Sequence, residues 1–381
     1  MTETLQPLLH DQEVVLAAPT QAWFAADGSM GDRAIQGIFV SDVRVVRALE
    51  YVTNSHPGEH IGTARDSATT VCITHLHRHL DAAGADPDVR SECVRTATIS
   101  GLDETVTISS RLPHPITVTL SARLAPDLSS MDAVKAGFAP AGVPGLEVTH
   151  SGATWADDDV SVSLDAPGSV VRSDGSQLDI DWTITIAPRS TATVGWTIRA
   201  VDRRAVVMGV DAPPEWDGVS VTASDVRFEK WIAASLDDLS ALRLTTLHAP
   251  GEQFLAAGAP WFFTLFGRDS IWAARMMLPF GTDIAASTLR TLAALQGTGR
   301  VADTAEQPGK IMHELRRAAL EIPGEGITLP PLYFGTVDAT ALWVCLLHDA
   351  FSWGMPENEV RALLPHLEAA LAWMRDFGDA D

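Results

Sequence analysis

The spacing of apolar residues changes once along this 381-residue chain, and that change limits it to two parts of different structural class. In the first half apolar and polar residues alternate, as in half-buried antiparallel strands whose side chains point to opposite faces in turn. Turn sequences rich in proline, glycine and aspartate separate these segments. Many short strands with polar outer faces predict an antiparallel β-sandwich. The alternation is clearest in five segments: 105–109, 116–124, 160–164, 178–186 and 192–200.

After Pro213–Pro214 the apolar residues recur at helical spacing. A first helix is expected to begin after Ser224 as N-cap and to carry its apolar residues on one face. Those residues are Phe228, Ile232, Leu236, Leu239 and Leu242. Three more helices are expected over 283–296, 337–351 and 357–377, with Pro365 at an expected kink of the last one.

The two periodicities predict a multi-domain chain, β and then α. We expect an N-terminal β-sandwich domain over 1–215, a linker with a helix over 216–252, and an all-α domain over 253–381. Two long loops, 297–310 and 321–335, interrupt the helices. Loops of that length inside a compact helical domain are often functional.

Charge and cysteine usage narrow the classes of partner. A formal net charge of −22 argues against nucleic acid and anionic membrane, which need a basic surface, and fits a neutral or cationic ligand. No apolar run approaches the ~20 residues that span a bilayer, and no signal-peptide pattern opens the chain. Cys72, Cys93 and Cys345 stand far apart among apolar neighbours, so we expect buried thiols and a cytoplasmic protein. No metal and no cofactor are expected.

The segment 261–272, "WFFTLFGRDSIW", places an arginine–aspartate pair among five aromatic residues. Adjacent helical residues point ~100° apart, so Arg268 and Asp269 can address one ligand only from the turn that opens a helix. Gly267 supplies that turn. A guanidinium donates and a carboxylate accepts, which suits the vicinal hydroxyls of a sugar. The alternative is that Asp269 caps the helix, Arg268 pairs with an exposed carboxylate, and the rings belong to the core.

Three segments, "APWFFTLFGRDSIWAARMMLP", "AEQPGKIMHELRR" and "YFGTVDATALWV", together resemble the bacterial amylo-α-1,6-glucosidase, or glycogen-debranching, family. "GIFVSDVRVV" at 37–46 resembles the signature of that family's N-terminal β-domain. The resemblance implies a β-sandwich followed by an (α/α)6 toroid, and an α-glucan or oligosaccharide substrate. It further implies that Arg268 and Asp269 bind the hydroxyls of the terminal glucose. Trp261 and Trp272 would stack on that sugar or form a wall beside it.

The resemblance also points to residues in the two later segments. Lys310, His313 and Glu314 are expected to line the cleft, although Glu314 is equally readable as an ordinary glutamate at a helix start. Asp338 is either a sugar contact or a first-turn acid that caps its helix. In the resembled family the general acid and the general base both lie later in the sequence than Asp381. We therefore expect a fragment that lacks the catalytic carboxylates and is inactive as given.

Three functions stay open at this point. The first is a glycoside hydrolase that cleaves α-glucosidic linkages with inversion. The second is a glycoside phosphorylase of similar architecture, and the third is a non-catalytic carbohydrate-binding protein.

A further motif, "THLHRHL", places His75, His77 and His79 at alternate positions of a strand. A metal site is the less favoured interpretation, because no carboxylate or cysteine nearby completes the set, and a solvated strand face is expected instead.

Overall fold

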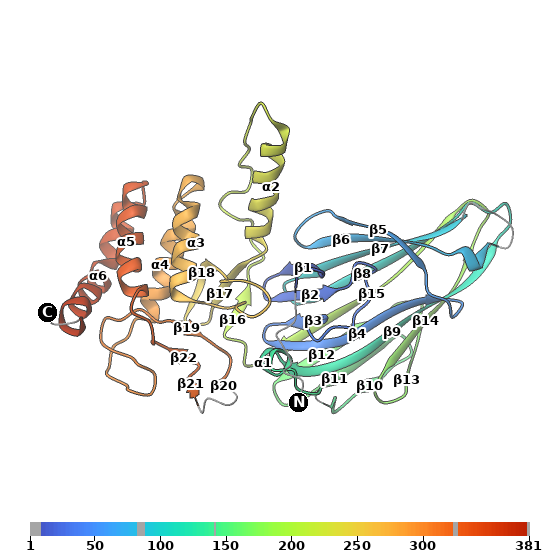
Figure 1. The fold of residues 1–381 in the computed structure, drawn as a ribbon, viewed down its shortest axis with the longest axis horizontal. Helices are drawn as coiled ribbons and strands as arrows, with labels where there is room; N and C mark the ends of the chain where they lie inside the picture. Colours follow the sequence, from blue (N-terminus) through green and yellow to red (C-terminus); the bar gives the residue numbers. More distant parts are fainter. Residues whose placement is uncertain (1–8, 82–87, 141, 323–326, 379–381) are drawn as a thin grey trace. The chain divides into compact units, whose positions relative to one another are not determined.

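A computed structural model describes residues 9–81, 88–140, 142–322 and 327–378. Within it the chain falls into two compact units, residues 1–203 and 204–381, called here the β unit and the helical unit. Figure 1 shows the strands of the first and the helices of the second. The sequence therefore predicted the order of the two classes correctly.

The β unit consists of two antiparallel sheets, together with a short helix α1 (Met131–Lys135) and a 3-10 turn η1 (Arg78–Leu80). The seven-stranded sheet runs, in spatial order, β1 (Glu13–Ala17), β2 (Thr20–Phe24), β3 (Gly37–Val40), β4 (Val43–Thr53), β9 (Ile116–Ser130), β14 (Leu178–Ile186) and β13 (Val170–Ser173). The eight-stranded sheet runs β10 (Glu147–Val148), β11 (Gly152–Ala156), β12 (Val160–Asp165), β15 (Thr191–Asp202), β8 (Gly101–Ser110), β7 (Val89–Thr98), β6 (Thr70–Leu76) and β5 (Glu59–Arg65).

The predicted alternation is confirmed in these sheets. All five segments lie within strands, namely β8, β9, β12, β14 and β15. Along β14 every second residue is buried, from Leu178 to Ile186, and its register pairs Trp182 with Leu120 of β9. The inward side chains of both sheets form one core, which includes the buried Trp155 and Trp196. The period of two thus places the apolar side chains between the sheets.

The signature at 37–46 has a structural role in the β unit. Gly37 has φ +140°, and a Cβ atom there would lie 2.4 Å from the carbonyl oxygen of Val46, so a larger residue does not fit. Arg44 is buried, and its Nε donates to Asp127 Oδ2 at 2.6 Å. The other oxygen of Asp127 accepts from the backbone of Leu128. This motif therefore fixes the β3–β4 hairpin against β9.

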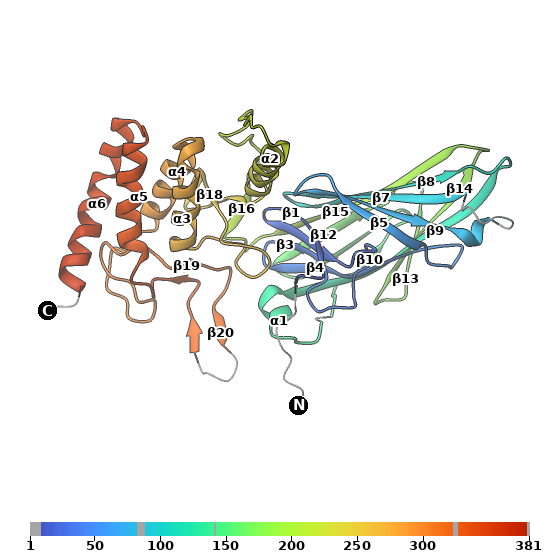
Figure 2. The same ribbon diagram turned by 45° about the horizontal axis from the view of Figure 1, so that its top comes forward.

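Five longer helices lie in the described residues of the helical unit. These are α2 (Val226–Ser240), α3 (Gly267–Met277), α4 (Asp283–Ala294), α5 (Ala339–Ser352) and α6 (Glu357–Phe377), with a 3-10 turn η2 (Leu278–Phe280) after α3. The expected helices over 283–296, 337–351 and 357–377 are confirmed within a few residues at each end. α3 packs on α4 and α5, and α5 packs on α6, as Figure 2 also shows. The Trp343 side chain of α5 is fully buried and donates to Leu289 O of α4 at 3.1 Å.

Two details of this unit correct the prediction. The expectation of an all-α second domain was wrong, because strands accompany the helices. They form a three-stranded sheet of β16 (Val207–Gly209), β17 (Arg243–Thr246) and β18 (Ala249–Leu255), and two hairpins, β19 (Glu314–Leu315) with β22 (Leu332–Tyr333) and β20 (Leu320–Ile322) with β21 (Ile327–Leu329). The N-cap of α2 is Asp225 rather than Ser224, because the Asp225 carboxylate accepts from the backbone N–H of Arg227 at 3.0 Å.

The compact units divide after Arg203, whereas the predicted boundary lay at residue 215. β16 begins at Val207 and pairs with β17, which ties residues before Pro213 to the helical unit. The expectation of buried thiols holds for Cys93, but Cys72 is half-buried and Cys345 is exposed on α5. Within the described part of the chain, no helix combines the length and the apolar character needed to cross a bilayer.

Candidate functional site

The first turn of α3 presents Arg268 and Asp269. Phe266 before it is extended, with φ −117° and ψ 126°, and Gly267 begins the helix. The Gly267 N–H donates to His313 O at 2.8 Å, and a Cβ atom on Gly267 would lie 2.2 Å from Met312 O. Only glycine therefore fits this close approach. The side chains of Arg268 and Asp269 are 45% and 43% exposed, so both are accessible to a ligand.

Arg268 also reaches the start of α5. Its Nη1 donates to Asp338 Oδ2 at 3.1 Å, and its Nε lies 3.9 Å from Asp269 Oδ2. One guanidinium thus lies between two carboxylates that belong to different helices. A guanidinium has five N–H donors, so Arg268 keeps donors for another partner. We call Arg268, Asp269 and Asp338 the charged cluster.

The Asp338 carboxylate is held in its ionised form. Burial acts to raise its pKa, but the hydrogen bonds from Thr336 Oγ1 and from Arg268, together with the arginine charge, outweigh burial and lower the pKa. Asp338 is the N-cap residue of α5, yet its side chain makes no capping hydrogen bond, and the same holds for the side chain before α3. The capping interpretation is therefore wrong for Asp338, whereas Asp269 lies in the first turn of α3, where a helix N-terminus favours a carboxylate. The cluster offers acceptors and donors side by side, as vicinal hydroxyls require.

A row of rings runs beside the cluster. Phe262 and Phe266 have centroids 5.5 Å apart, Phe266 and His313 5.9 Å, and His313 and Tyr333 5.9 Å, all edge to face. Backbone pairing holds the row together, because His313 N donates to Tyr333 O at 2.7 Å and Leu315 N to Leu265 O at 3.0 Å. The sequence did not single out Phe262 or Phe266 by position. The sequence feature that could have identified them is the run of aromatic residues before Gly267.

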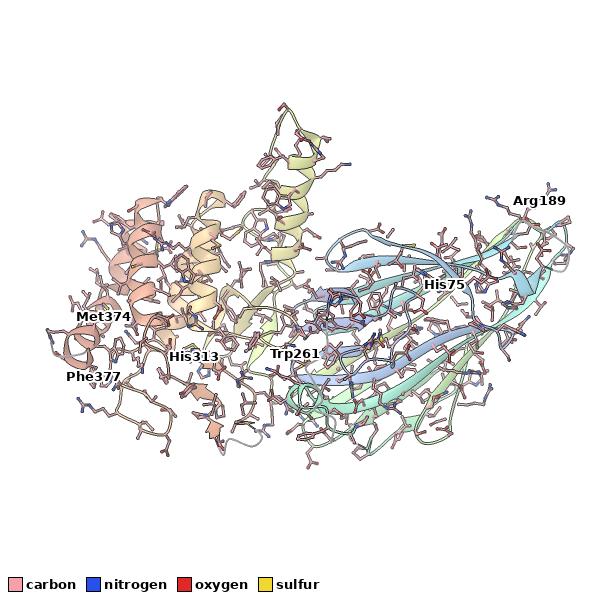
Figure 3. All side chains as sticks on the ribbon, in the orientation of Figure 1. His75, Arg189, Trp261, His313, Met374 and Phe377 are labelled. Carbon is pink, nitrogen blue, oxygen red and sulfur yellow. The ribbon has the colours of Figure 1, made fainter. Side chains whose placement is uncertain are left out.

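His313 has an unusual environment within this row. Its Nδ1 is buried and finds no hydrogen-bond partner among the residues that the structure describes. Figure 3 labels His313 in the helical unit, where it joins the backbone of the 264–267 segment to that of β22. Its side chain therefore keeps one ring nitrogen unsatisfied inside the fold.

The side chains of Glu314 and Lys310 contact partners other than the charged cluster. Glu314 lies in β19, not at a helix start, and its 3% exposed side chain pairs with Arg316 Nη2 at 2.9 Å. Lys310 is buried, its Nζ donates to Ala305 O at 3.3 Å, and its ammonium lies 5.5 Å from the Trp373 ring. Burial lowers the pKa of Lys310.

Trp272 and Trp261 lie on either side of the first turn of α3 in sequence. Trp272 is 41% exposed, with the Arg275 guanidinium 5.1 Å from its ring. Trp261 is half-buried in the loop before α3. Of the eight expected binding residues, the structure brings three together by direct contact: Arg268, Asp269 and Asp338.

The expectation of a solvated strand face was wrong for His77, whereas His75 is half-buried and His79 is exposed. His77 is 4% exposed, and its ring bonds Thr53 Oγ1 at 2.9 Å and Ser91 Oγ at 2.8 Å. His79 lies in η1 and bonds the carbonyl oxygen of Thr53 at 2.9 Å. Within the described ranges, no group of three or more histidine, cysteine or acidic residues has the arrangement to hold a metal ion.

Comparison with known proteins gives a family for the β unit. Residues 15–197 match the model of the N-terminal domain of (some) glycogen debranching enzymes. A search of curated proteins finds no match. Among solved structures, "Putative kojibiose phosphorylase from human microbiome" is 7% identical with a TM-score of 0.55, over 94% of this chain and 56% of that chain. A galactose mutarotase-like protein from Lactobacillus casei ATCC 334 is 11% identical with a TM-score of 0.34, over 50% of this chain and 100% of that one.

These findings agree with the resemblance seen in the sequence motifs. The phosphorylase likeness extends over both units, so the fold of antiparallel sheets followed by a helical region is shared. This chain spans 56% of the length of that phosphorylase. Residues 15–197, which make up most of the β unit, therefore match the N-terminal domain of glycogen debranching enzymes.

Proposed function

We propose that the charged cluster is the sugar-binding subsite of a carbohydrate-active enzyme that acts on α-glucosidic linkages of glycogen-type substrates. The single observation that carries the proposal is the placement of Arg268 between Asp269 and Asp338, all partly exposed, at the starts of α3 and α5. A sugar presents adjacent hydroxyls that both donate and accept. One guanidinium flanked by two carboxylates offers the donors and acceptors that such a pair of hydroxyls needs.

We propose further that the helical unit is the first part of an (α/α)6 toroid. In support, α3, α4, α5 and α6 pack consecutively on one another, and the starts of α3 and α5 lie together. The exposed Phe262 ring at the end of the aromatic row suits the apolar face of a pyranose. The cytoplasm is the proposed location, because the three cysteines form no disulfide with one another.

The acids of the cluster are poor candidates for proton transfer. A general acid must hold a proton near the working pH, whereas the pKa of Asp338 is lowered. Asp269 lies beside the same arginine, and Glu314 is buried against Arg316. Inverting hydrolysis needs an acid and a base ~6.5–9.5 Å apart across the scissile bond. We therefore propose a binding role for Asp269 and Asp338, and no turnover by residues 1–381 on their own.

The test of this function is activity of the intact gene product. Asp269→Ala should lower kcat/KM on isomaltose, panose or a limit dextrin by at least ~100-fold, because the bound hydroxyls lose a charged acceptor that cannot be replaced. The matched control is Glu357→Ala, whose carboxylate is 68% exposed on α6 and pairs with Arg361. Equal activity of the two variants would refute a binding role for Asp269. Glucose release by residues 1–381 that Asp338→Ala abolishes would instead make the cluster catalytic.

Phosphorolysis is the second candidate, favoured by the fold shared with the kojibiose phosphorylase. The discriminating measurement is product identity with and without inorganic phosphate. Release of free glucose without phosphate supports hydrolysis. Formation of a glucose phosphate that requires phosphate supports phosphorolysis. Saturable sugar binding with neither product would favour a non-catalytic carbohydrate-binding protein.

A further inference from the structure

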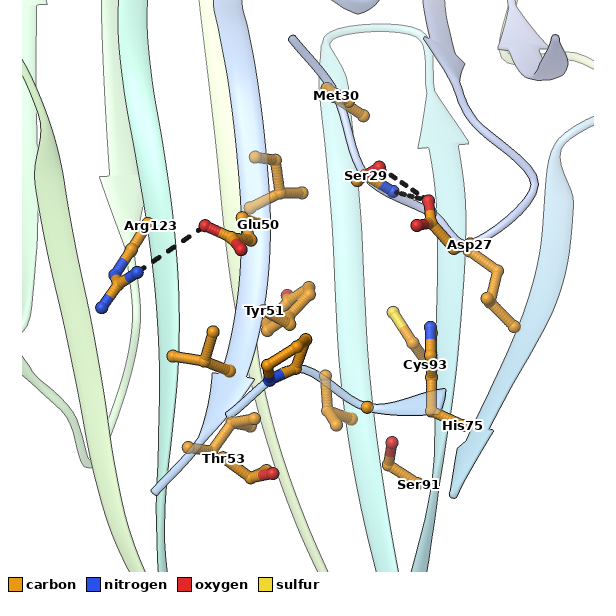
Figure 4. Close-up of a pocket in the computed structure, with 18 of the residues that line it drawn as sticks. Asp27, Ser29, Met30, Glu50, Tyr51, Thr53, His75, Ser91, Cys93 and Arg123 are labelled. Atoms are coloured by element: carbon orange, nitrogen blue, oxygen red, sulfur yellow. Dashed lines mark hydrogen bonds and ion pairs between the residues drawn. The ribbon is translucent and has the colours of Figure 1, made fainter. Parts of the chain in front are cut away.

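A cavity of about 430 Å3 lies in the β unit, between β4 of one sheet and β6 and β7 of the other. The segments that follow β2 and β4 contribute Asp27, Met30 and Pro57 to its wall (Figure 4). Its volume falls within the ~300–1,000 Å3 typical of small-molecule pockets. The pairing of β4 with β9 shifts register between Val46 and Ala48, next to the cavity, and such bulges often re-aim strands at ligand sites.

A buried guanidinium in the cavity wall has an unused donor. Arg95 on β7 is 0% exposed. Its Nε and Nη2 donate to the two oxygens of Glu104 at 2.8 and 3.1 Å, and Nη2 also donates to Gly28 O at 3.0 Å. Its Nη1 has no hydrogen-bond partner among the residues that the structure describes. A guanidinium stays charged, so unbonded N–H groups inside the protein are costly. An acceptor held in the cavity would remove that cost.

Other polar groups of the wall are neutral donors and acceptors. His77 lies between Thr53 and Ser91, and burial lowers its pKa to about 4, so it is uncharged at neutral pH. The Tyr51 hydroxyl accepts from Trp196 Nε1 at 2.6 Å, which leaves its own hydrogen to donate. Tyr51 stands in the middle of the cavity wall in Figure 4.

Three acidic residues, Asp27, Asp32 and Glu50, complete the lining. Asp27 accepts from the backbone N–H of Ser29 at 3.0 Å and from its hydroxyl at 2.6 Å, which fixes the carboxylate in the loop after β2. Glu50 on β4 lies 3.7 Å from Arg123, a loose ion pair that leaves acceptor capacity (Figure 4). These carboxylates disfavour an anionic ligand, and the number of polar groups disfavours an apolar one.

We propose that this cavity binds a neutral carbohydrate of one or two sugar units. Hydroxyls of the sugar accept from Arg95 Nη1 and Tyr51, and donate to Asp27. The Tyr51 ring and the Met30 side chain supply apolar surface for the ring carbons. The site lies entirely within the β unit and does not depend on the charged cluster of the helical unit.

The test uses the full chain with Arg268→Ala and Asp269→Ala, so that the charged cluster is removed. Glucose, maltose and isomaltose are titrated by calorimetry. Pro57→Trp adds a bulky ring at an exposed position of the cavity wall, and Pro113→Trp is its control at an exposed proline outside the wall. We expect saturable binding that Pro57→Trp and Asp27→Asn each weaken about tenfold or more, equivalent to ~1.4 kcal/mol, and that Pro113→Trp leaves unchanged.

Three results would overturn the proposal. One is the absence of sugar binding once Arg268 and Asp269 are replaced, while the unmodified chain binds. Another is sugar binding that survives Pro57→Trp. The last is no sugar binding by either the unmodified chain or the chain with Arg268→Ala and Asp269→Ala. A different result would show that the charged cluster does not bind sugar. In that case Arg268→Ala and Asp269→Ala leave the sugar affinity of the full chain unchanged, while Pro57→Trp abolishes binding.

Discussion

At the residue scale, Arg268 connects the parts of the candidate site. The motif around it could be recognised from the sequence, and Asp269 and Asp338 could be named from the sequence as candidate sugar contacts. Their contact could not, because Asp338 lies 70 residues from Arg268 and only the packing of α3 on α5 brings them together. For the same reason the buried pairing of Glu314 with Arg316 was not predictable, since a local pattern does not report burial.

His77 predicts a pH dependence of stability. Its pKa of about 4 in the folded β unit lies below its ordinary 6.5, because burial and the neighbouring histidines disfavour the charged ring. Between these values the unfolded chain binds a proton that folded His77 does not. The contribution of His77 to the free energy of unfolding should therefore be fully present above pH ~6.5. It should fall by up to about 3 kcal/mol as the pH falls toward 4.

Denaturant unfolding between pH 7 and pH 4 checks this, with His77→Gln beside the unchanged protein. The variant should lose less stability over that range, because it lacks the depressed group. His114→Gln, at an exposed position, is the control and should follow the unchanged protein. Parallel curves for all three proteins would show that His77 does not contribute.

At the scale of elements, long periodic segments were predictable and short ones were not. The nine residues of β14 and the 21 residues of α6 carry enough repeats to define their period. The strands β16, β19 and β22 have two or three residues each, too few for any period, and their pairing partners lie far away in sequence. The loop expected over 297–310 is confirmed, whereas the loop expected over 321–335 carries the short strands β21 and β22.

The start of α3 yields a prediction at this scale. Gly267→Ala should destabilise the helical unit by about 1–3 kcal/mol, because the added methyl group meets Met312 O and must displace the helix or the strand. Gly299→Ala is the matched control, since nothing lies within 4 Å of a Cβ atom there. Thermal unfolding monitored at 222 nm, a helix wavelength, compares the two. Equal stability would mean that the close approach at Gly267 is not required.

At the scale of the whole molecule, the chain combines a β unit of known family with a helical unit that carries the charged cluster. The sandwich closes its own core from both sheets, and the family model ends within it. Residues 1–203 expressed alone should therefore unfold in one cooperative transition with a β-type circular dichroism spectrum. A spectrum without β-structure, or no thermal transition, would show that the β unit needs the rest of the chain.

The central claim is that Arg268, Asp269 and Asp338 bind one sugar together. The most direct measurement is a double-mutant cycle on binding of maltose and isomaltose to the full chain with the β-unit cavity closed by Pro57→Trp. Arg268→Ala and Asp338→Ala should each weaken binding about tenfold or more, and the double variant should lose much less than the sum, because the two residues act on one ligand. Arg361→Ala, which removes an exposed arginine of α6, should have no effect. Unchanged sugar affinity in both single variants would contradict the account. So would losses of affinity that simply add in the double variant and are no larger than the loss in the Arg361 variant.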